Sequence, residues 1–396
     1  MLSKVLSVPA VVAIASIVSV ARAVDLSCND NVAVYWGQNS YGATNAADRA
    51  NWQKRLAHYC RDDAIDVIPL AFMTTSYGVG GLPEINLADA CNNNDNGTFP
   101  GTNLADCGRL ADDIEYCQSK GKTILLSMGG ATGNAGFEDA NQASEFATTA
   151  WNMFLGGTHQ YRPFGKASLD GIDLDIESPH NPELWEVFTE RLRQHFNETN
   201  RQYVISAAPQ CVFPDAALGT WLNHAWVDMV FVQFYNNFCG LNAYGDAKQW
   251  NFGDWAVWAK TRSKNDKVRV FIGAPASATA AGTGYLDIAK LQNAATETAR
   301  SFSSFGGIML WDASQAEANN GYAQAIKQTL KSNSSCGSTS TLANCTADAW
   351  TAGNNYQAGA RVAHTGFVWE AKWSASSEPG NASGEQSEWM AVQECT

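Results

Sequence analysis

Basic residues are scarce in this sequence. Its 396 residues include 26 lysines and arginines against 39 aspartates and glutamates, so the formal net charge is −13 at pH 7. Such a charge repels phosphate groups, which excludes nucleic acids and anionic membrane surfaces as partners. Histidines are also few, six in all, and they are scattered along the chain. Because no C-x-x-C pair or Cys/His cluster accompanies them, the sequence indicates no metal site and no cofactor.

Long apolar runs are absent after the first 23 residues. The run at residues 5–20 follows Lys4 and precedes the small-x-small end of residues 21–23, which is the pattern of a secretory signal peptide. The run is short for a membrane span, and the C-terminal VQECT offers no hydrophobic tail for a lipid anchor. We therefore expect residues 1–23 to be a signal peptide, with an uncleaved anchor as the alternative, and the mature protein to be secreted to the cell exterior or cell wall.

The cysteine content fits an oxidising compartment. There are ten cysteines, an even number, and their spacing favours disulfides over metal ligation. N-glycosylation acceptor sequences of the type N-x-[ST] occur at Asn96, Asn197, Asn333, Asn344 and Asn381. These features predict a disulfide-bonded glycoprotein.

Short β-branched segments alternate with longer helical ones over residues 31–314. The helical patterning is clearest in residues 110–121 and 182–196. The eight strand-like segments are residues 31–37, 64–73, 122–130, 169–177, 203–209, 227–237, 268–276 and 305–313. Eight such repeats predict an α/β fold of the (β/α)₈ TIM-barrel type. An open doubly wound sheet is the alternative, but no Gly-rich phosphate loop follows the first strand.

The segment LDGIDLDIE, residues 169–177, places three acids at every second position. On a strand, Asp173, Asp175 and Glu177 share one face and are about 6.6 Å apart, while isoleucines and a leucine occupy the other face. In a barrel the aliphatic face meets the helices, so the acids point inward and ascend toward the C-terminal end, where barrel active sites lie. Because buried acids are costly without partners, the pattern favours acid–base catalysis over a solvated strand face or a divalent metal site.

DGIDLDIE resembles the D-G-x-D-x-D-x-E signature of family 18 glycoside hydrolases, which include chitinases. The resemblance extends over residues 30–331 and is greatest to the class III type of plants and fungi. Flanking matches occur in order at residues 33–39, 69–73, 85–91, 125–130, 207–215, 232–237 and 306–311.

The resemblance implies a role for each acid. Glu177 would protonate the glycosidic oxygen, and the nucleophile would be the 2-acetamido oxygen of the substrate itself, which makes this family an exception among retaining enzymes. Asp175 would orient that acetamide and stabilise the oxazolinium intermediate. Asp173, behind it, would share a proton with Asp175, because neighbouring carboxylates do not both ionise cheaply. Tyr235 would donate its hydroxyl to the developing charge.

The resemblance also implies a set of substrate-binding residues. Trp311 would form the floor of a cleft on which sugar rings stack, although each aromatic in the set has core packing as its alternative. The remaining members are the rim residues Tyr35, Phe72, Gly129 and Gly130, the polar contacts Gln233 and Asn236, and the outer-subsite residues Gln38 and Asn86. Relatives hold non-proline cis bonds at the positions matching 71–72 and 311–312, so cis bonds are expected there.

Disulfide pairs follow partly from the same resemblance. It implies pairs of Cys60 with Cys117, Cys91 with Cys107, and Cys211 with Cys239. Four cysteines remain, and they allow three connectivities. Since Cys28 and Cys336 bracket the barrel and Cys345 and Cys395 bracket the C-terminal segment beyond it, we infer pairing within each bracket.

The barrel pattern ends near residue 331. Residues 332–344 form a Ser/Thr-rich linker, and residues 345–396 resemble the small chitin- and cellulose-binding modules of families 5 and 12. Four tryptophans fall in this short β-rich segment, and exposed tryptophans stack on sugars. Trp373 is the first expected binder, followed by Trp369 and Trp350, whereas Trp389 suits a core. Ser374 stands where relatives often carry a second aromatic, which leaves fewer stacking rings.

Together these features predict a secreted, monomeric, endo-acting chitinase. Its catalytic barrel spans residues 24–331, and its partners are chitin and N-acetylglucosamine oligomers. One alternative is an endo-β-N-acetylglucosaminidase acting on N-glycans, which shares the signature. Another is a catalytically weak lectin or inhibitor, although such relatives usually lack the acid that this chain retains at Glu177.

Overall fold

The computed structural model describes residues 24–178, 180–336 and 342–396. The expected signal peptide, residues 1–23, and part of the expected linker lie outside these ranges. Within them, no helix combines the length and apolar character that crossing a membrane requires.

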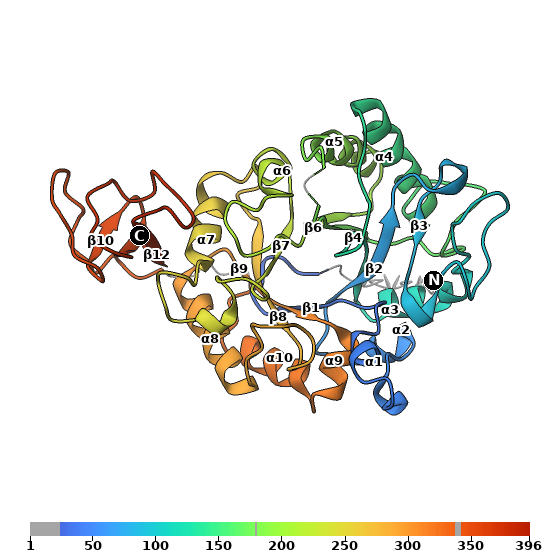
Figure 1. The fold of residues 1–396 in the computed structure, drawn as a ribbon, viewed down its shortest axis with the longest axis horizontal. Coiled ribbons are helices and arrows are strands. Elements are labelled where there is room, and N and C mark those ends of the chain that lie inside the picture. Colours follow the sequence, from blue (N-terminus) through green and yellow to red (C-terminus); the bar gives the residue numbers. More distant parts are fainter. Residues whose placement is uncertain (1–23, 179, 337–341) are drawn as a thin grey trace, which may run out of the picture.

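Eight parallel strands close into a barrel, as the sequence predicted (Figure 1). Strand β1 pairs with β9 on one side and with β2 on the other, which completes the ring. The short β3 (Glu84–Ile85) adds to β2 in the antiparallel sense. The barrel strands are β1 (Asn31–Val34), β2 (Val67–Thr75), β4 (Thr123–Gly129), β5 (Gly171–Asp175), β6 (Val204–Ala207), β7 (Met229–Gln233), β8 (Arg269–Pro275) and β9 (Phe305–Trp311).

Helices surround the strands, and the longer ones bury an apolar face. In α5, for example, Trp185, Phe188, Leu192 and Phe196 recur at helical spacing and are all buried against the barrel. The helices are α1 (Ser40–Thr44), α2 (Leu56–Tyr59), α3 (Ala111–Ser119), α4 (Ala140–Phe154), α5 (Leu184–Asn197), α6 (Gly219–His224), α7 (Phe252–Thr261), α8 (Ile288–Ser301), α9 (Ala313–Ala318) and α10 (Tyr322–Ser332).

The alternation of side chains along each strand creates two separate hydrophobic clusters. Val230 and Val232 of β7 belong to the large cluster between strands and helices. Met229 and Phe231 of the same strand belong to a smaller cluster that also includes Tyr35 and Phe72. The smaller cluster fills the barrel interior, as expected for a small closed barrel.

Two non-proline cis peptide bonds occur where the resemblance placed them, at Ala71–Phe72 and Trp311–Asp312. A cis bond also precedes Pro214. The ten cysteines form the five pairs expected from the sequence, Cys28–Cys336, Cys60–Cys117, Cys91–Cys107, Cys211–Cys239 and Cys345–Cys395.

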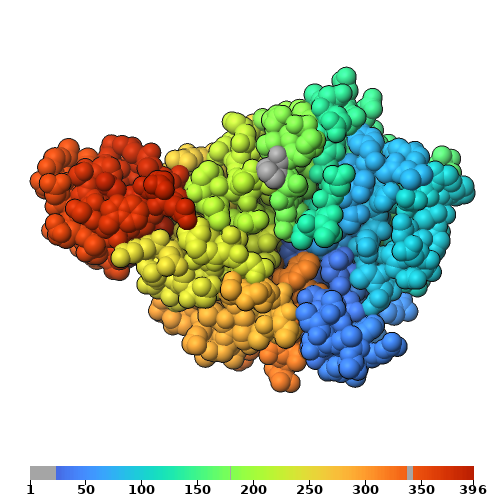
Figure 2. Space-filling view, viewed as in Figure 1, coloured from blue at the N-terminus to red at the C-terminus, as the bar shows by residue number. Residues whose placement is uncertain are grey.

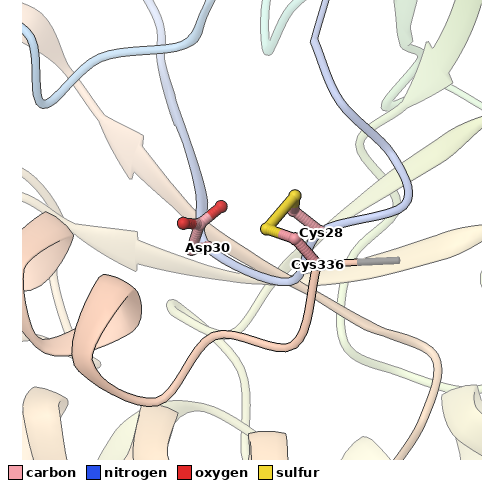
Figure 3. Close-up of side chains that lie close together, drawn as sticks. All are labelled: Cys28, Asp30 and Cys336. Atoms are coloured by element: carbon pink, nitrogen blue, oxygen red, sulfur yellow. A yellow bond between two sulfur atoms is a disulfide. The ribbon is translucent and has the colours of Figure 1, made fainter. Parts of the chain in front are cut away.

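One group of potential metal ligands, Cys28, Asp30 and Cys336, lies close together among the described residues. Figure 3 shows that its two sulfur atoms are bonded to each other. A disulfide offers no thiolate, and the thiolate is the form in which cysteine binds metals. The Cys28–Cys336 disulfide therefore links the two ends of the barrel segment covalently, and the group is not a metal site.

A second, smaller body follows the barrel (Figures 1 and 2). Its antiparallel sheet consists of β10 (Arg361–His364), β11 (Phe367–Ala371) and β12 (Trp389–Glu394). The Cys345–Cys395 disulfide joins the two ends of the segment, and Trp369 and Trp389 are buried within it. We call residues 345–396 the C-terminal module.

Candidate active site

Strand β5 positions the three acids of LDGIDLDIE. Ile172, Leu174 and Ile176 belong to the cluster under the helices, so the carboxylates point to the barrel interior. Asp173 and Asp175 lie on the strand, and both are buried. Glu177 follows two residues beyond the strand end and is partly exposed. The acids therefore ascend from the closed interior to the open face of the barrel.

Asp173 is held by three hydroxyl groups. Tyr35 and Ser127 donate to its Oδ2 over 2.6 and 2.7 Å, and Ser206 donates to its Oδ1 over 2.7 Å. The two serines stand directly beside Asp173 in the sheet, one on β4 and one on β6. Burial raises the pKa of Asp173, and these three donors oppose that rise.

Asp175 has a different environment. Its Oδ1 accepts a hydrogen bond of 2.8 Å from Nε2 of Gln233, which also donates to the backbone oxygen of Ala208. Burial raises the pKa of Asp175 well above its ordinary value, and the nearby charges of Glu177 and Asp173 raise it further. The pair of Asp173 and Asp175 therefore binds a proton more readily than two isolated carboxylates would.

Gly129 lets strand β4 end close against Asp175. Its φ of 108° is unfavourable for residues with a side chain, and a Cβ atom there would lie 2.3 Å from the backbone oxygen of Asp175. The next residue, Gly130, donates its N–H to that same oxygen over 2.8 Å. The two glycines therefore fix the end of β5 from which Glu177 projects.

Glu177 stands beside a further buried acid, Asp215, that the sequence did not suggest. Asp215 accepts N–H bonds from Gln210, Ala217 and Leu218 and so holds the loop after β6. Burial raises the pKa of Glu177, and the charge of Asp215 raises it further. A carboxyl with a raised pKa keeps its proton at higher pH, as a general acid requires.

Tyr235 follows β7 and is buried in the barrel-interior cluster. Burial raises the pKa of its hydroxyl well above the ordinary value, and the charges of Asp175 and Glu177 add to that rise. The hydroxyl therefore remains protonated and can act only as a neutral hydrogen-bond donor or acceptor at physiological pH.

Aromatic rings form the base of the site. Trp311 is partly exposed, and its ring stacks on Phe72 with centroids 5.9 Å apart and an interplanar angle of 17°. The ring centroids of Tyr35 and Trp311 lie 5.6 Å apart, but Tyr35 is buried, and its hydroxyl donates a hydrogen bond to Asp173. The expectation that Tyr35 lines the rim is therefore wrong, because the ring lies beneath the floor and supports it.

These residues surround one cleft of about 320 Å³. Its lining includes most of the expected residues together with four that the sequence did not suggest, Thr74, Ala131, Thr132 and Ala280. The expected residues that line it are Gln38, Phe72, Asn86, Gly129, Gly130, Asp175, Glu177, Gln233, Tyr235, Asn236 and Trp311. Figure 2 shows a recess on this face between the blue, green and orange segments.

Two polar side chains of the lining make hydrogen bonds to the backbone of neighbouring loops. Nε2 of Gln38 donates to the backbone oxygens of Ala71 and Asn86. Oδ1 of Asn236 accepts from the N–H groups of Gly282 and Thr283. Both side chains therefore shape the loops around the cleft and have only their remaining amide atoms for a ligand.

A larger cavity, of about 400 Å³, lies between Trp36, Gln53 and Arg109. None of the acids of β5 lines it. The chemistry of the lining, rather than the volume, therefore identifies the smaller cleft as the site. That cleft combines a partly exposed acid with a raised pKa, a carboxylate behind it, a neutral phenol and an aromatic floor, which suits proton transfer to a ring-shaped polar substrate.

The tryptophans of the C-terminal module differ in exposure. Trp373 is 42% exposed, and Trp350 is partly exposed. Trp369 is 2% exposed, and its Nε1 donates to the backbone oxygen of His364. The expectation that Trp369 binds polymer is therefore wrong, because its place on the inner face of β11 puts the ring in the module core. Trp389 lies in that core as expected.

The chain is similar to known proteins in sequence and in structure. The family model described as "Glycosyl hydrolases family 18" matches residues 31–369. Chitinase 1 of Rhizopus niveus is 43% identical over 311 residues, which cover 78% of this chain and 59% of that protein. The chain spans between 51% and 59% of the length of three such curated relatives.

Solved structures are similar over the barrel. The ICChI chitinase from Ipomoea carnea superposes with a TM-score of 0.62 at 32% identity, covering 76% of this chain and 99% of that one. The xylanase and α-amylase inhibitor protein XAIP-II from Scadoxus multiflorus superposes with a TM-score of 0.61 at 31% identity, covering 75% and 97%.

Proposed function

The chain belongs to the glycosyl hydrolases of family 18, and from this premise we propose that it is a secreted chitinase. It cleaves β-1,4 bonds between N-acetylglucosamine units at internal positions of the polymer, acts as a monomer and needs no cofactor. The observation that carries the proposal is the gathering of Asp175, Glu177 and Tyr235 around one cleft whose floor is Trp311. Several relatives of this chain bear the name chitinase.

In the proposed mechanism, Glu177 is the general acid. Its raised pKa keeps the proton available, and its place at the open end of the acid column lets it reach the glycosidic oxygen. The substrate's own acetamide oxygen attacks the anomeric carbon as the leaving group departs, which forms an oxazolinium intermediate. Glu177, now a carboxylate, then accepts a proton from the water that opens this intermediate.

Asp175 and Tyr235 hold the acetamide in this proposal. The carboxyl group of Asp175, oriented by Gln233, accepts the acetamide N–H and faces the positive charge of the intermediate. The neutral hydroxyl of Tyr235 donates to the acetamide oxygen, because its raised pKa keeps the proton in place. Asp173, tied by three hydroxyl groups, keeps negative charge behind the site.

The experiment that tests the proposal is proton NMR of freshly cleaved chitin oligomers. Two successive inversions at one carbon restore its configuration, so the first product should be the β-anomer. Fully deacetylated chitosan should be inert however well it binds, because it lacks the nucleophile. An initial α-anomer, or ready cleavage of the deacetylated polymer, would contradict the mechanism.

Two other functions are separated by a simple comparison of substrates. The similarity to an inhibitor protein makes a non-enzymatic role the second candidate. The presence of both Asp175 and Glu177 in the cleft argues against that role. An N-glycan endoglycosidase is the other. Colloidal chitin and a high-mannose glycopeptide, assayed side by side, distinguish these from the proposed chitinase, since an inhibitor cleaves neither and an endoglycosidase prefers the glycopeptide.

A further inference from the structure

The C-terminal module packs directly against helix α7 of the barrel. Strand β12 lies so close to α7 that a Cβ atom on Gly253 would be 1.8 Å from the backbone oxygen of Ala391. Figure 1 shows the module beside α7, at the edge of the barrel. Such an approach between two backbones is possible only because position 253 has no side chain.

A buried carboxylate anchors one end of this contact. Oε2 of Glu394 accepts hydrogen bonds from the backbone N–H and the hydroxyl of Ser303, over 2.9 and 2.6 Å. Its Oε1 lies 3.1 Å from Nζ of Lys260 on α7. Because Glu394 is buried, its charge needs these barrel partners, and a module swinging on a linker would leave it without them.

A second anchor holds the other end. Oδ2 of Asp254 accepts the N–H of Gly384 over 3.3 Å, while Nζ of Lys372 donates to the backbone oxygen of Gly384 over 2.8 Å. Asp254 and Lys372 are both buried, and their opposite charges attract. Gly384 also lies against the backbone oxygen of Phe213, in the loop after β6. Two anchors at different ends of α7 prevent the module from rotating about either one.

The direction of α7 decides which end of the module lies near the cleft. Helix α7 follows β7, so its first residues, Gly253 and Asp254, lie at the face where the strands end and where the cleft opens. Lys260 lies near the opposite face, as does Ser303, which precedes β9. The anchor at Asp254 therefore lies at the same face of the barrel as the cleft. Because Trp373 follows Lys372, which belongs to this anchor, Trp373 lies at the end of the module nearest that face.

At this end of the module, Trp373 has one face of its indole ring free. Nζ of Lys372 lies 5.2 Å from the centroid of the ring and covers one side, while the side chain remains 42% exposed. An exposed indole face suits stacking on a pyranose ring.

We propose that the module and the cleft form one continuous binding surface, on which Trp373 stacks on the same chitin chain that occupies the cleft above Trp311. The inference rests on the proposed function and adds to it a remote subsite of fixed position. Its ligand is a soluble or surface-exposed β-1,4-linked N-acetylglucosamine chain long enough to reach both tryptophans.

The test compares kcat/KM on an N-acetylglucosamine tetramer with kcat/KM on glycol chitin, a long soluble polymer. Trp373→Ala should lower the value for glycol chitin about three- to tenfold and leave the tetramer unchanged. Trp226→Ala is the matched control, because Trp226 is 50% exposed but precedes β7 at the opposite face. It should change neither substrate.

Gly253→Ala tests whether fixed placement matters. The added methyl group favours the helix but collides with β12, so it displaces the module without altering any residue of the module. It should reproduce the glycol chitin loss of Trp373→Ala, and the double variant should lose no more than either alone. If Gly253→Ala does not fold, the pair Lys260→Ala and Ser303→Ala gives the same comparison.

Unchanged activity of Trp373→Ala on glycol chitin would overturn the inference. So would a normal Gly253→Ala enzyme beside an impaired Trp373→Ala enzyme, since the module would then act as a tethered binder. A wild-type enzyme inactive on both substrates would instead overturn the proposed function, and this inference with it.

Discussion

The hydroxyl of Tyr35 and the carboxylate of Asp173 lie 2.6 Å apart at the buried centre of the barrel. Ser127 and Ser206 complete the set of donors around that carboxylate. A hydrogen bond to a charged group contributes about 1.5–3 kcal/mol, so its loss at a buried site leaves the charge poorly satisfied. The lost donor also removes an influence that lowers the pKa of Asp173.

Tyr35→Phe should therefore reduce kcat by about ten- to a hundredfold while changing KM little, because the ring still supports Trp311. Steady-state kinetics on chitin oligomers measure the effect. Tyr41→Phe is the control, since the Tyr41 hydroxyl also donates to an aspartate, Asp48, but away from the cleft. Equal losses in the two variants would contradict a role for Tyr35 through Asp173.

Removing the acid itself should have a larger effect. Glu177→Gln should lower kcat by about 10²–10⁴-fold with oligomer binding preserved, because the amide has nearly the same shape but cannot donate the catalytic proton. Asp175→Asn should also be severe, since it removes the charge that faces the proposed intermediate. Kinetics and calorimetric binding measure the two quantities, with the exposed Glu183→Gln as control. A Glu177→Gln enzyme of normal rate would show that another group is the acid.

The pH profile should report the influence of Asp215 on Glu177. Burial and the charge of Asp215 raise the pKa of Glu177, so the protonated form persists to higher pH, and kcat/KM falls as pH rises through that pKa. Asp215→Asn removes a negative charge and should lower the pKa, which moves the alkaline limb of kcat/KM to lower pH. An unmoved limb, or one moved to higher pH, would mean that Asp215 does not act on Glu177 electrostatically.

Much of the site could be predicted from the sequence because its pattern is local. Alternation along LDGIDLDIE is enough to place Asp173 and Asp175 inside a barrel, and eight repeats indicate that barrel. The residue roles and three of the disulfides came only with the family resemblance. Ser127 and Ser206 were missed because they meet Asp173 through the register between strands, which the closure of the whole barrel decides.

The C-terminal module was less predictable for a related reason. A tryptophan on a short strand can face either side of the sheet, and a change of one residue in register exchanges the two faces. Sequence reasoning therefore ranked Trp373 first among the expected binders but did not recognise that Trp369 is buried. The packing of the module on α7 depends on contacts between residues more than a hundred positions apart in the chain, such as Asp254 with Gly384. No local sequence pattern indicates such contacts.

The same contact should make module packing depend on pH. Burial raises the pKa of Asp254 from 3.8 to about 6, although the charges of Lys372 and Arg262 oppose the rise. A carboxyl with a raised pKa in the folded state contributes stability that is fully present below about pH 4 and is lost as pH rises through about 6. The difference corresponds to at most about 3 kcal/mol.

Thermal unfolding should thus show a more stable module contact at pH 5 than at pH 7.5. Asp254→Asn should flatten this dependence, because the amide oxygen can still accept the Gly384 N–H but does not titrate. Asp287→Asn serves as a control at an exposed helix N-cap, where burial plays no such part. A wild-type contact that strengthens toward neutral pH would contradict the assignment.

The two tryptophans of β11 and the loop after it should separate folding of the module from binding by it. Trp369→Ala removes a buried side chain and leaves a cavity, so it should destabilise the module by about 3–5 kcal/mol. Trp373→Ala removes an exposed ring and should change stability by no more than about 0.5 kcal/mol. Both variants should be poorly retained on insoluble chitin, but only Trp369→Ala should also lose protection of the module against limited proteolysis. If Trp373→Ala were retained as well as the wild-type enzyme, the exposed ring would not be the binding face, and the partly exposed Trp350 would be the residue to replace next.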